Sequence, residues 1–147
     1  MMAAALLAVA TALLSQHLGG VMPCAWCVLQ RLILLSLAAA AGLGLLLPGQ
    51  AGRRLGAGLA LLLAGLGGGA ALWQHFVAAS SASCDQTLAD RVMGATGLDS
   101  RFPEVFAAYA SCADAKADLL GLPYEFWSLV LFMLLGGLAW RVLRRPG

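Results

Sequence analysis

Charged residues are scarce in this sequence. Lysine and arginine together number 9 and aspartate and glutamate 7, so charged residues make up 11% of the 147 positions. Soluble domains carry about 25% charged residues, and a set this small cannot cover the surface of a globule of this length. The scarcity excludes an ordinary soluble domain. We expect no nucleic acid partner.

Long apolar runs accompany the low charge. Hydrophobic residues make up 61% of the chain, and the mean hydropathy is +0.87. Runs of about 18 or more apolar residues are typical of membrane-spanning helices. We predict an all-α membrane protein, one domain over residues 1–147, built as an antiparallel bundle of four transmembrane helices. The predicted helices cover about residues 2–18, 28–47, 55–77 and 123–143.

The first and third runs carry further signals. No basic segment precedes the first run and no small-residue cleavage site precedes Cys24, so we expect a retained helix rather than a signal peptide. The third run is rich in glycine. Gly65 and Gly69 have the spacing that allows close approach of a neighbouring helix, and we expect that approach to occur inside the bundle.

Arginine positions predict the orientation of the bundle. Arg53 and Arg54 separate the second and third runs, and Arg141, Arg144 and Arg145 end the fourth. In a four-helix topology these two places lie on one side of the membrane, and positive loops are typically cytoplasmic. The remaining two loops then face outward. These outer loops comprise residues 19–27 and 78–122.

The longer outer loop has its own apolar pattern. Phe102, Val105, Phe106 and Tyr109 recur at helical spacing. We predict a short amphipathic surface helix near Pro103 to Ala110, lying on the membrane or over the mouth of the bundle.

All four cysteines fall in the outer loops or at their edges. Cys24 and Cys27 form a Cys-x-x-Cys pair, and Cys84 and Cys112 lie in the longer loop. Such pairs are typical of redox or metal chemistry, and an oxidising outer compartment is where disulfides persist. Cys84 and Cys112 could form a structural disulfide or one that exchanges with a partner's thiol, and we favour exchange.

Cys27 has the surroundings of a reactive thiol. It lies at the predicted start of a helix, where the unpaired N–H groups favour an anion. Arg31 follows four residues later, on the same helix face. Both effects lower a thiol pKa, so we expect Cys27 to form a stable thiolate.

Metal binding is a weaker alternative. Structural zinc sites favour two closely spaced ligand pairs, and Cys84 and Cys112 are far apart in the sequence. The two histidines, His17 and His75, end apolar helices on the outer side. Each could bind a headgroup or relay protons, or simply lie at the interface; we include both as candidate cofactor-binding residues.

Two sets of residues carry a resemblance that spans the whole chain. The first set consists of Gln16-His17, Pro23-Cys24-Ala25-Trp26-Cys27 and Arg31. The second set consists of Cys84-Asp85, Cys112-Ala113, Leu120-Gly121-Leu122 and Trp127. The first set is similar to the first outer loop of the disulfide bond formation protein B (DsbB) family, and the second is similar to that family's second outer loop and fourth helix. One departure is Gln30, where the family often has an acidic residue. In vitamin K epoxide reductase-like proteins the Cys-x-x-Cys pair follows the loop pair, so the order here argues against them.

The resemblance implies a quinone-dependent thiol oxidase of a bacterial inner membrane, with its cysteines facing the periplasm. Cys84–Cys112 would take electrons from a reduced, DsbA-like thioredoxin-fold protein. Cys112 would then engage Cys24 and release Cys27 as a thiolate against ubiquinone or menaquinone, with Arg31 stabilising the negative charge.

We therefore predict a membrane thiol:quinone oxidoreductase without a metal. Two alternatives stay open. One is a non-enzymatic membrane protein whose loops are braced by disulfides or zinc, and the other is a vitamin K epoxide reductase-like enzyme.

Overall fold

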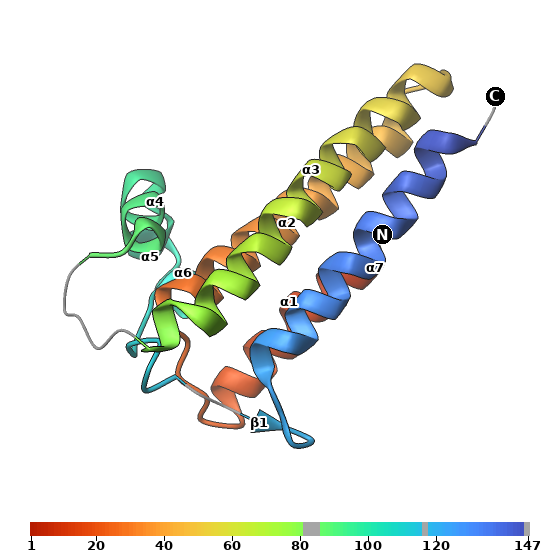
Figure 1. Ribbon diagram of the computed structural model, residues 1–147. Coiled ribbons are helices and arrows are strands. Elements are labelled where there is room, and N and C mark those ends of the chain that lie inside the picture. The colour runs from red at the N-terminus through yellow and green to blue at the C-terminus, as the bar shows by residue number, and fades with distance from the viewer. Residues whose placement is uncertain (81–85, 116–117, 146–147) are drawn as a thin grey trace.

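The computed structural model describes residues 1–80, 86–115 and 118–145, and its main feature is a bundle of four long helices (Figure 1). Shorter elements gather at one end of the bundle. The elements are α1 Met2–His17, α2 Ala25–Leu46, α3 Gly49–Phe76, the 3₁₀ turn η1 Ala78–Ser80, α4 Leu88–Thr96, α5 Leu98–Arg101, α6 Pro103–Phe106, β1 Asp118–Leu119, β2 Leu122–Pro123 and α7 Tyr124–Arg144.

Three helices in the described part of the chain are long and apolar enough to cross a membrane. They contain 22, 32 and 21 residues and cover Ala25–Leu46, Gly49–Ser80 and Tyr124–Arg144. The apolar helix α1 has 16 residues and is therefore about 24 Å long, whereas the hydrocarbon core of a bilayer is about 30 Å thick. The structure thus supports a multi-pass membrane protein with three candidate spans.

Two helices begin earlier than predicted. Helix α2 begins at Ala25 instead of residue 28, which brings Cys27 into its first turn. Helix α3 begins at Gly49 instead of residue 55, so Arg53 and Arg54 are helical. Proline favours an extended conformation in the residue before it, and Leu47, just before Pro48, is extended. The chain therefore turns at these two residues, and α3 begins directly after them.

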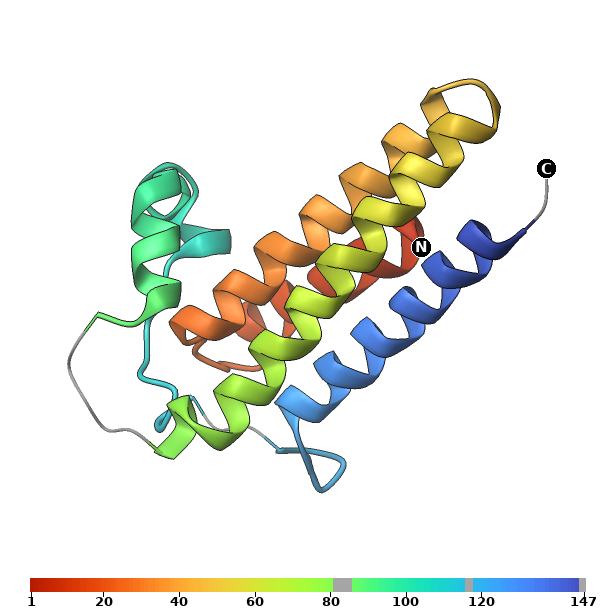
Figure 2. The same ribbon diagram turned by 45° about the horizontal axis from the view of Figure 1, so that its top comes forward.

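Helices α2 and α3 pack side by side, α7 packs on the other side of α3, and α1 packs on α2 (Figure 2). Buried side chains of all four helices form one cluster, here called the inner core. It consists of Ala5, Val9, Leu34, Leu37, Ala38, Ala60, Ala64, Phe132, Leu135 and Ala139.

Glycine brings the helices together, but not at the predicted positions. A Cβ atom at Gly56 would lie 2.7 Å from the Ala40 carbonyl oxygen of α2, and a Cβ at Gly67 would overlap the Phe132 ring of α7. A Cβ atom at Gly65 or Gly69 would meet no atom of a neighbouring helix within 4 Å. The prediction of close packing at Gly65 and Gly69 is wrong, because they lie on the exposed face of α3.

The short helices lie beside α2 at the end of the bundle where α2 and α7 begin, here called the cysteine end (Figure 1). Thr87 and Asp90 cap the start of α4 with reciprocal hydrogen bonds. Met93 of α4 and Phe106 of α6 pack on Val28 of α2. The helix predicted near Pro103 to Ala110 is not confirmed at that length. The structure has a four-residue helix, Pro103–Phe106, which ends because Ala107 is extended.

A two-residue turn precedes α7. Strands β1 and β2 pair in antiparallel fashion, and Leu120 and Gly121 both have positive φ angles, of 56° and 80°. Two such residues are typical of a type I′ hairpin. Trp127 Nε1 donates a hydrogen bond to the Leu119 carbonyl oxygen at 3.1 Å, which ties the hairpin to α7.

Candidate functional site

Two cysteines lie at the start of α2. Cys24 is the N-cap residue and has no solvent exposure, whereas Cys27 is partly exposed and lines a cavity. Their Sγ atoms are 3.1 Å apart, longer than the roughly 2.05 Å of a disulfide bond, and both are free thiols. The pair is close enough to form a disulfide after a small movement, with Cys27 as the sulfur that faces the cavity.

Cys112 lies against Cys24 from the long loop. Cys112 packs on the buried cluster that contains Cys24, and each of these two thiols is the largest cause of the other's pKa shift. The backbone N–H of Tyr109 holds the loop in place by donating to the Pro23 carbonyl oxygen at 2.9 Å. Three sulfurs therefore follow one another from the loop to the cavity, in the order Cys112, Cys24, Cys27.

The interaction between these two thiols shifts their pKa values in opposite directions. It raises the pKa of Cys24 to about 12, with burial as a further cause. The same interaction lowers the pKa of Cys112. Cys24 is thus the proton donor of the pair, and Cys112 is the better nucleophile because a thiolate attacks disulfides where a thiol does not.

Polar side chains that the sequence analysis did not identify as site residues surround Cys27. Gln74 Nε2 of α3 donates to Cys27 Sγ at 3.2 Å and to Glu125 Oε1 of α7 at 3.4 Å. Gln30 Nε2 of α2 donates to Gln74 Oε1 at 2.7 Å. All three of these polar residues are buried. Polar residues near the ends of apolar helices are rare and typically functional in membranes. This feature of the sequence could have identified the three residues.

Arg31 is buried beside this network and joins three segments. Its Nη1 donates to Gln16 Oε1 of α1 at 2.6 Å and to the Val105 carbonyl oxygen of α6 at 3.0 Å. Its Nη2 donates to the Ala12 carbonyl oxygen at 3.5 Å. The guanidinium makes no hydrogen bond to Cys27 in the described part of the chain, and the sulfur's donor is Gln74 instead.

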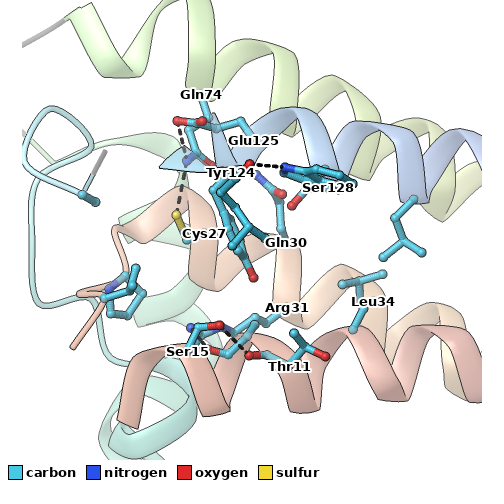
Figure 3. Close-up of a pocket in the computed structure, with 18 of the residues that line it drawn as sticks. Thr11, Ser15, Cys27, Gln30, Arg31, Leu34, Gln74, Tyr124, Glu125 and Ser128 are labelled. Carbon is cyan, nitrogen blue, oxygen red and sulfur yellow. Dashed lines mark hydrogen bonds between the residues drawn. The ribbon is translucent and has the colours of Figure 1, made fainter. Parts of the chain in front are cut away.

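A cavity of about 270 Å³ brings Cys27, Gln30, Arg31, Gln74 and Glu125 together (Figure 3). Helix α1 forms one wall and α7 the other, with α2 and α3 between them. Most of the remaining lining is apolar or weakly polar. It consists of Ala8, Thr11, Ala12, Ser15, Val21, Met22, Pro23, Leu34, Ala115, Leu119, Tyr124, Trp127, Ser128 and Leu131. A ring-shaped apolar ligand with a few polar atoms suits such a site.

The two histidines lie outside the cavity lining. His17 is exposed at the end of α1. The His75 ring packs on Phe126 and Phe76, with ring centroids 4.6 and 5.0 Å away. His75 follows Gln74 directly on α3, so its side chain points about 100° away around the helix.

Cys84 lies outside the residues that the structure describes. Within residues 1–80, 86–115 and 118–145, no three His, Cys, Asp or Glu side chains are grouped as a metal site.

Comparison with known proteins decides the family. The family Disulfide bond formation protein DsbB matches residues 1–142. The chain belongs to the DsbB family. Relatives named disulfide bond formation protein B occur in Aromatoleum aromaticum (34% identical, covering 88% of this chain and 80% of the relative) and Nitrosospira multiformis (33%, 90% and 80%). Disulfide bond formation protein B 2 of Pseudomonas aeruginosa is 33% identical over 87% of this chain and 78% of its own length. No solved structure gives a significant match.

Membership of the DsbB family confirms the predicted resemblance. Proteins of this family are quinone-dependent oxidoreductases, so the chain is a membrane enzyme of disulfide bond formation. Family membership therefore argues against the two alternatives, a non-enzymatic scaffold and a vitamin K epoxide reductase-like enzyme.

Proposed function

We propose that this enzyme reoxidises a periplasmic, DsbA-like thioredoxin-fold protein and passes the electrons along Cys84, Cys112, Cys24 and Cys27 to a membrane quinone. The observation that carries the proposal is the row of three sulfurs from Cys112 through Cys24 to Cys27, which ends at the cavity. Electrons leaving a soluble partner need such a route to reach a carrier in the lipid.

The proposal includes a membrane placement. All four long helices cross a bacterial inner membrane, with the shorter α1 tilted little or flanked by a locally thinner bilayer. Arg53, Arg54, Arg141 and Arg144 lie at the opposite end of the bundle from the cysteines. By the positive-inside rule this arginine end is cytoplasmic and the cysteine end periplasmic.

The thiol steps follow from the order of the sulfurs. The partner's thiolate attacks Cys84 of the Cys84–Cys112 disulfide, and Cys112 leaves as a thiolate while the partner's second thiol resolves the mixed disulfide. The Cys112 thiolate then attacks Sγ of Cys24, which forms a Cys24–Cys112 bond and breaks the Cys24–Cys27 bond. Cys27 leaves as a thiolate that accepts the hydrogen bond from Gln74 Nε2. The Cys84 thiolate released by the partner then attacks Cys112, which re-forms the Cys84–Cys112 bond and breaks the Cys24–Cys112 bond. Cys24 and Cys27 take up the two protons of the partner's dithiol and end as the reduced pair.

The residues of the cavity fit a quinone headgroup. Its volume of about 270 Å³ is close to the lower end of the range for small-molecule pockets, roughly 300 Å³. Arg31 has five N–H donors, and the described hydrogen bonds use three of them. Ubiquinone and menaquinone both offer two ring oxygens to such donors, and either would supply an acceptor of two electrons and two protons. His17 and His75 belong in the proposal at the edge of the site, as groups that exchange protons with the headgroup region.

The test of this function is quinone reduction by the Cys27→Ser variant. We expect purified enzyme to form quinol from a short-chain quinone when it is given a reduced DsbA-like protein, and Cys27→Ser to abolish that reaction. The control is Ser36→Ala on the same helix, because Ser36 Oγ bonds only to the Leu32 carbonyl oxygen among the described hydrogen bonds. Undiminished turnover in Cys27→Ser would contradict the proposal.

A further inference from the structure

Glu125 is a buried carboxyl group without a cationic partner among the described residues. Its side chain lies in the first turn of α7 and is 6% exposed. No Lys, Arg or His in the described ranges forms an ion pair with it, and its described hydrogen bond comes from Gln74 Nε2 at 3.4 Å. Burying an ionised carboxylate without a counter-ion is costly, so a carboxyl group retained here calls for a reason other than stability.

Glu125 shares its hydrogen-bond donor with the sulfur that faces the cavity. The amide nitrogen of Gln74 carries two hydrogens, and it lies 3.2 Å from Cys27 Sγ and 3.4 Å from Glu125 Oε1. Gln30 fixes this orientation, because its Nε2 occupies the oxygen end of the same amide at 2.7 Å. One amide group therefore holds a thiol and a carboxyl group at the same side of the cavity (Figure 3).

The other titratable groups around Glu125 have different chemistry. Cys27, Arg31 and Tyr124 also line the cavity, and His75 lies behind Phe126. Cys27 is the electron donor of the proposed reaction, and the guanidinium of Arg31 stays protonated. The α1 wall contributes no titratable side chain to the lining. Glu125 is thus the carboxyl group of the cavity, and Gln30 and Gln74 cannot titrate.

The geometry points to Glu125 as the acid–base residue that transfers a proton between the cysteines and the quinone. This assignment rests on the proposed function. Glu125 donates its proton to one ring oxygen as two electrons arrive from the dithiol, so its O–H bond breaks and a quinol O–H bond forms. The Glu125 carboxylate then receives a proton released by the Cys24 and Cys27 thiols as their S–S bond forms. The second released proton goes to the other ring oxygen, so two electrons and two protons balance and Glu125 ends unchanged. Gln74 is a positioning residue in this scheme.

The experiment compares Glu125→Gln with Glu104→Gln in the full-length enzyme. The first substitution keeps an oxygen for the Gln74 hydrogen bond and replaces the acidic group by an amide that cannot titrate, while Glu104 is exposed and outside the cavity lining. Acid–base catalysis contributes about 10²-fold or more, so we expect Glu125→Gln to lower kcat about 100-fold with an unchanged quinone KM. Glu125→Asp should restore part of kcat, and Glu104→Gln should equal the wild type.

A second readout does not depend on turnover. The infrared difference spectrum between the dithiol and disulfide forms of quinone-free enzyme should contain a carboxyl band, since a change at Cys27 alters the hydrogen bonds of Gln74 and hence of Glu125. The band should be absent from Glu125→Gln and present in Glu104→Gln. A kcat within about twofold of wild type for Glu125→Gln, a change confined to KM, or an unaltered infrared spectrum would each overturn the role of Glu125. A wild-type enzyme that reduces no quinone would instead overturn the proposed function.

Discussion

The inner core and the cysteine end of the bundle bury different kinds of side chain. In the inner core, alanine and glycine let helices approach until Phe132 of α7 lies on Gly67 of α3. At the cysteine end, the same helices bury Gln30, Arg31, Gln74 and Glu125. The inner core is filled by apolar contacts, whereas the cysteine end leaves a cavity of about 270 Å³ whose mainly apolar lining includes these four polar side chains.

This difference separates stability from chemistry. Inside a bilayer, helix association depends on close packing more than on the hydrophobic effect, which the inner core supplies. Buried polar groups are costly unless they are hydrogen-bonded, and the cysteine end offsets that cost by connecting α1, α2, α3, α6 and α7 through Gln74 and Arg31. Substitutions in the two regions should therefore affect different measurements.

The largest expected effect is on stability, from Phe132→Ala in the inner core. Phe132 is 1% exposed, and large-to-small core substitutions of phenylalanine cost about 3 kcal/mol or more. We expect the free energy of unfolding in detergent to fall by about that amount, while the quinone KM of the folded fraction is unchanged. The control is Met133→Ala, since Met133 is 69% exposed. An equal loss of unfolding free energy in Phe132→Ala and Met133→Ala would contradict the assignment of Phe132 to the inner core.

A smaller effect is expected on quinone affinity, from Arg31→Ala at the cysteine end. A hydrogen bond from a charged group contributes about 1.5 kcal/mol or more, so the quinone KM should rise at least about tenfold. Arg31→Lys should give an intermediate value, because lysine keeps the charge but loses the planar fork of donors. An unchanged KM in Arg31→Ala would remove Arg31 from the quinone site.

The smallest effect concerns the order of thiol reactivity in the fully reduced enzyme. A lowered pKa gives Cys112 a larger thiolate fraction at any pH below the ordinary thiol value of 9.0, and the raised pKa of about 12 keeps Cys24 protonated there. We expect Cys112 to be alkylated before Cys24 below pH 9.0, as measured by mass spectrometry of labelled peptides. The control is Cys24→Ala, which removes this interaction and should shift the labelling of Cys112 to higher pH. Faster labelling of Cys24 in the wild-type enzyme would contradict the assigned donor.

The sequence predicted the helices well and the site only in part. Hydropathy locates all four long helices to within a few residues at most ends, because each of them is a continuous apolar run. It misses the start of α3 by six residues, since Arg53 and Arg54 look like loop residues although arginine is a good helix former. The cysteine motif predicted reactive thiols, but Gln74 and Glu125 could not be placed beside Cys27. Their contact depends on how α3 and α7 pack on α2, which no local pattern specifies.

The central claim is that electrons pass from the long loop to the cavity through adjacent sulfurs. It is tested most directly by disulfide mapping in an enzyme that carries Cys27→Ser and Cys84→Ser, which leaves Cys24 and Cys112 as its cysteines. After mild oxidation and digestion without reductant, the account predicts one intramolecular peptide link between Cys24 and Cys112. Two free thiols, or links only between separate molecules, would contradict it.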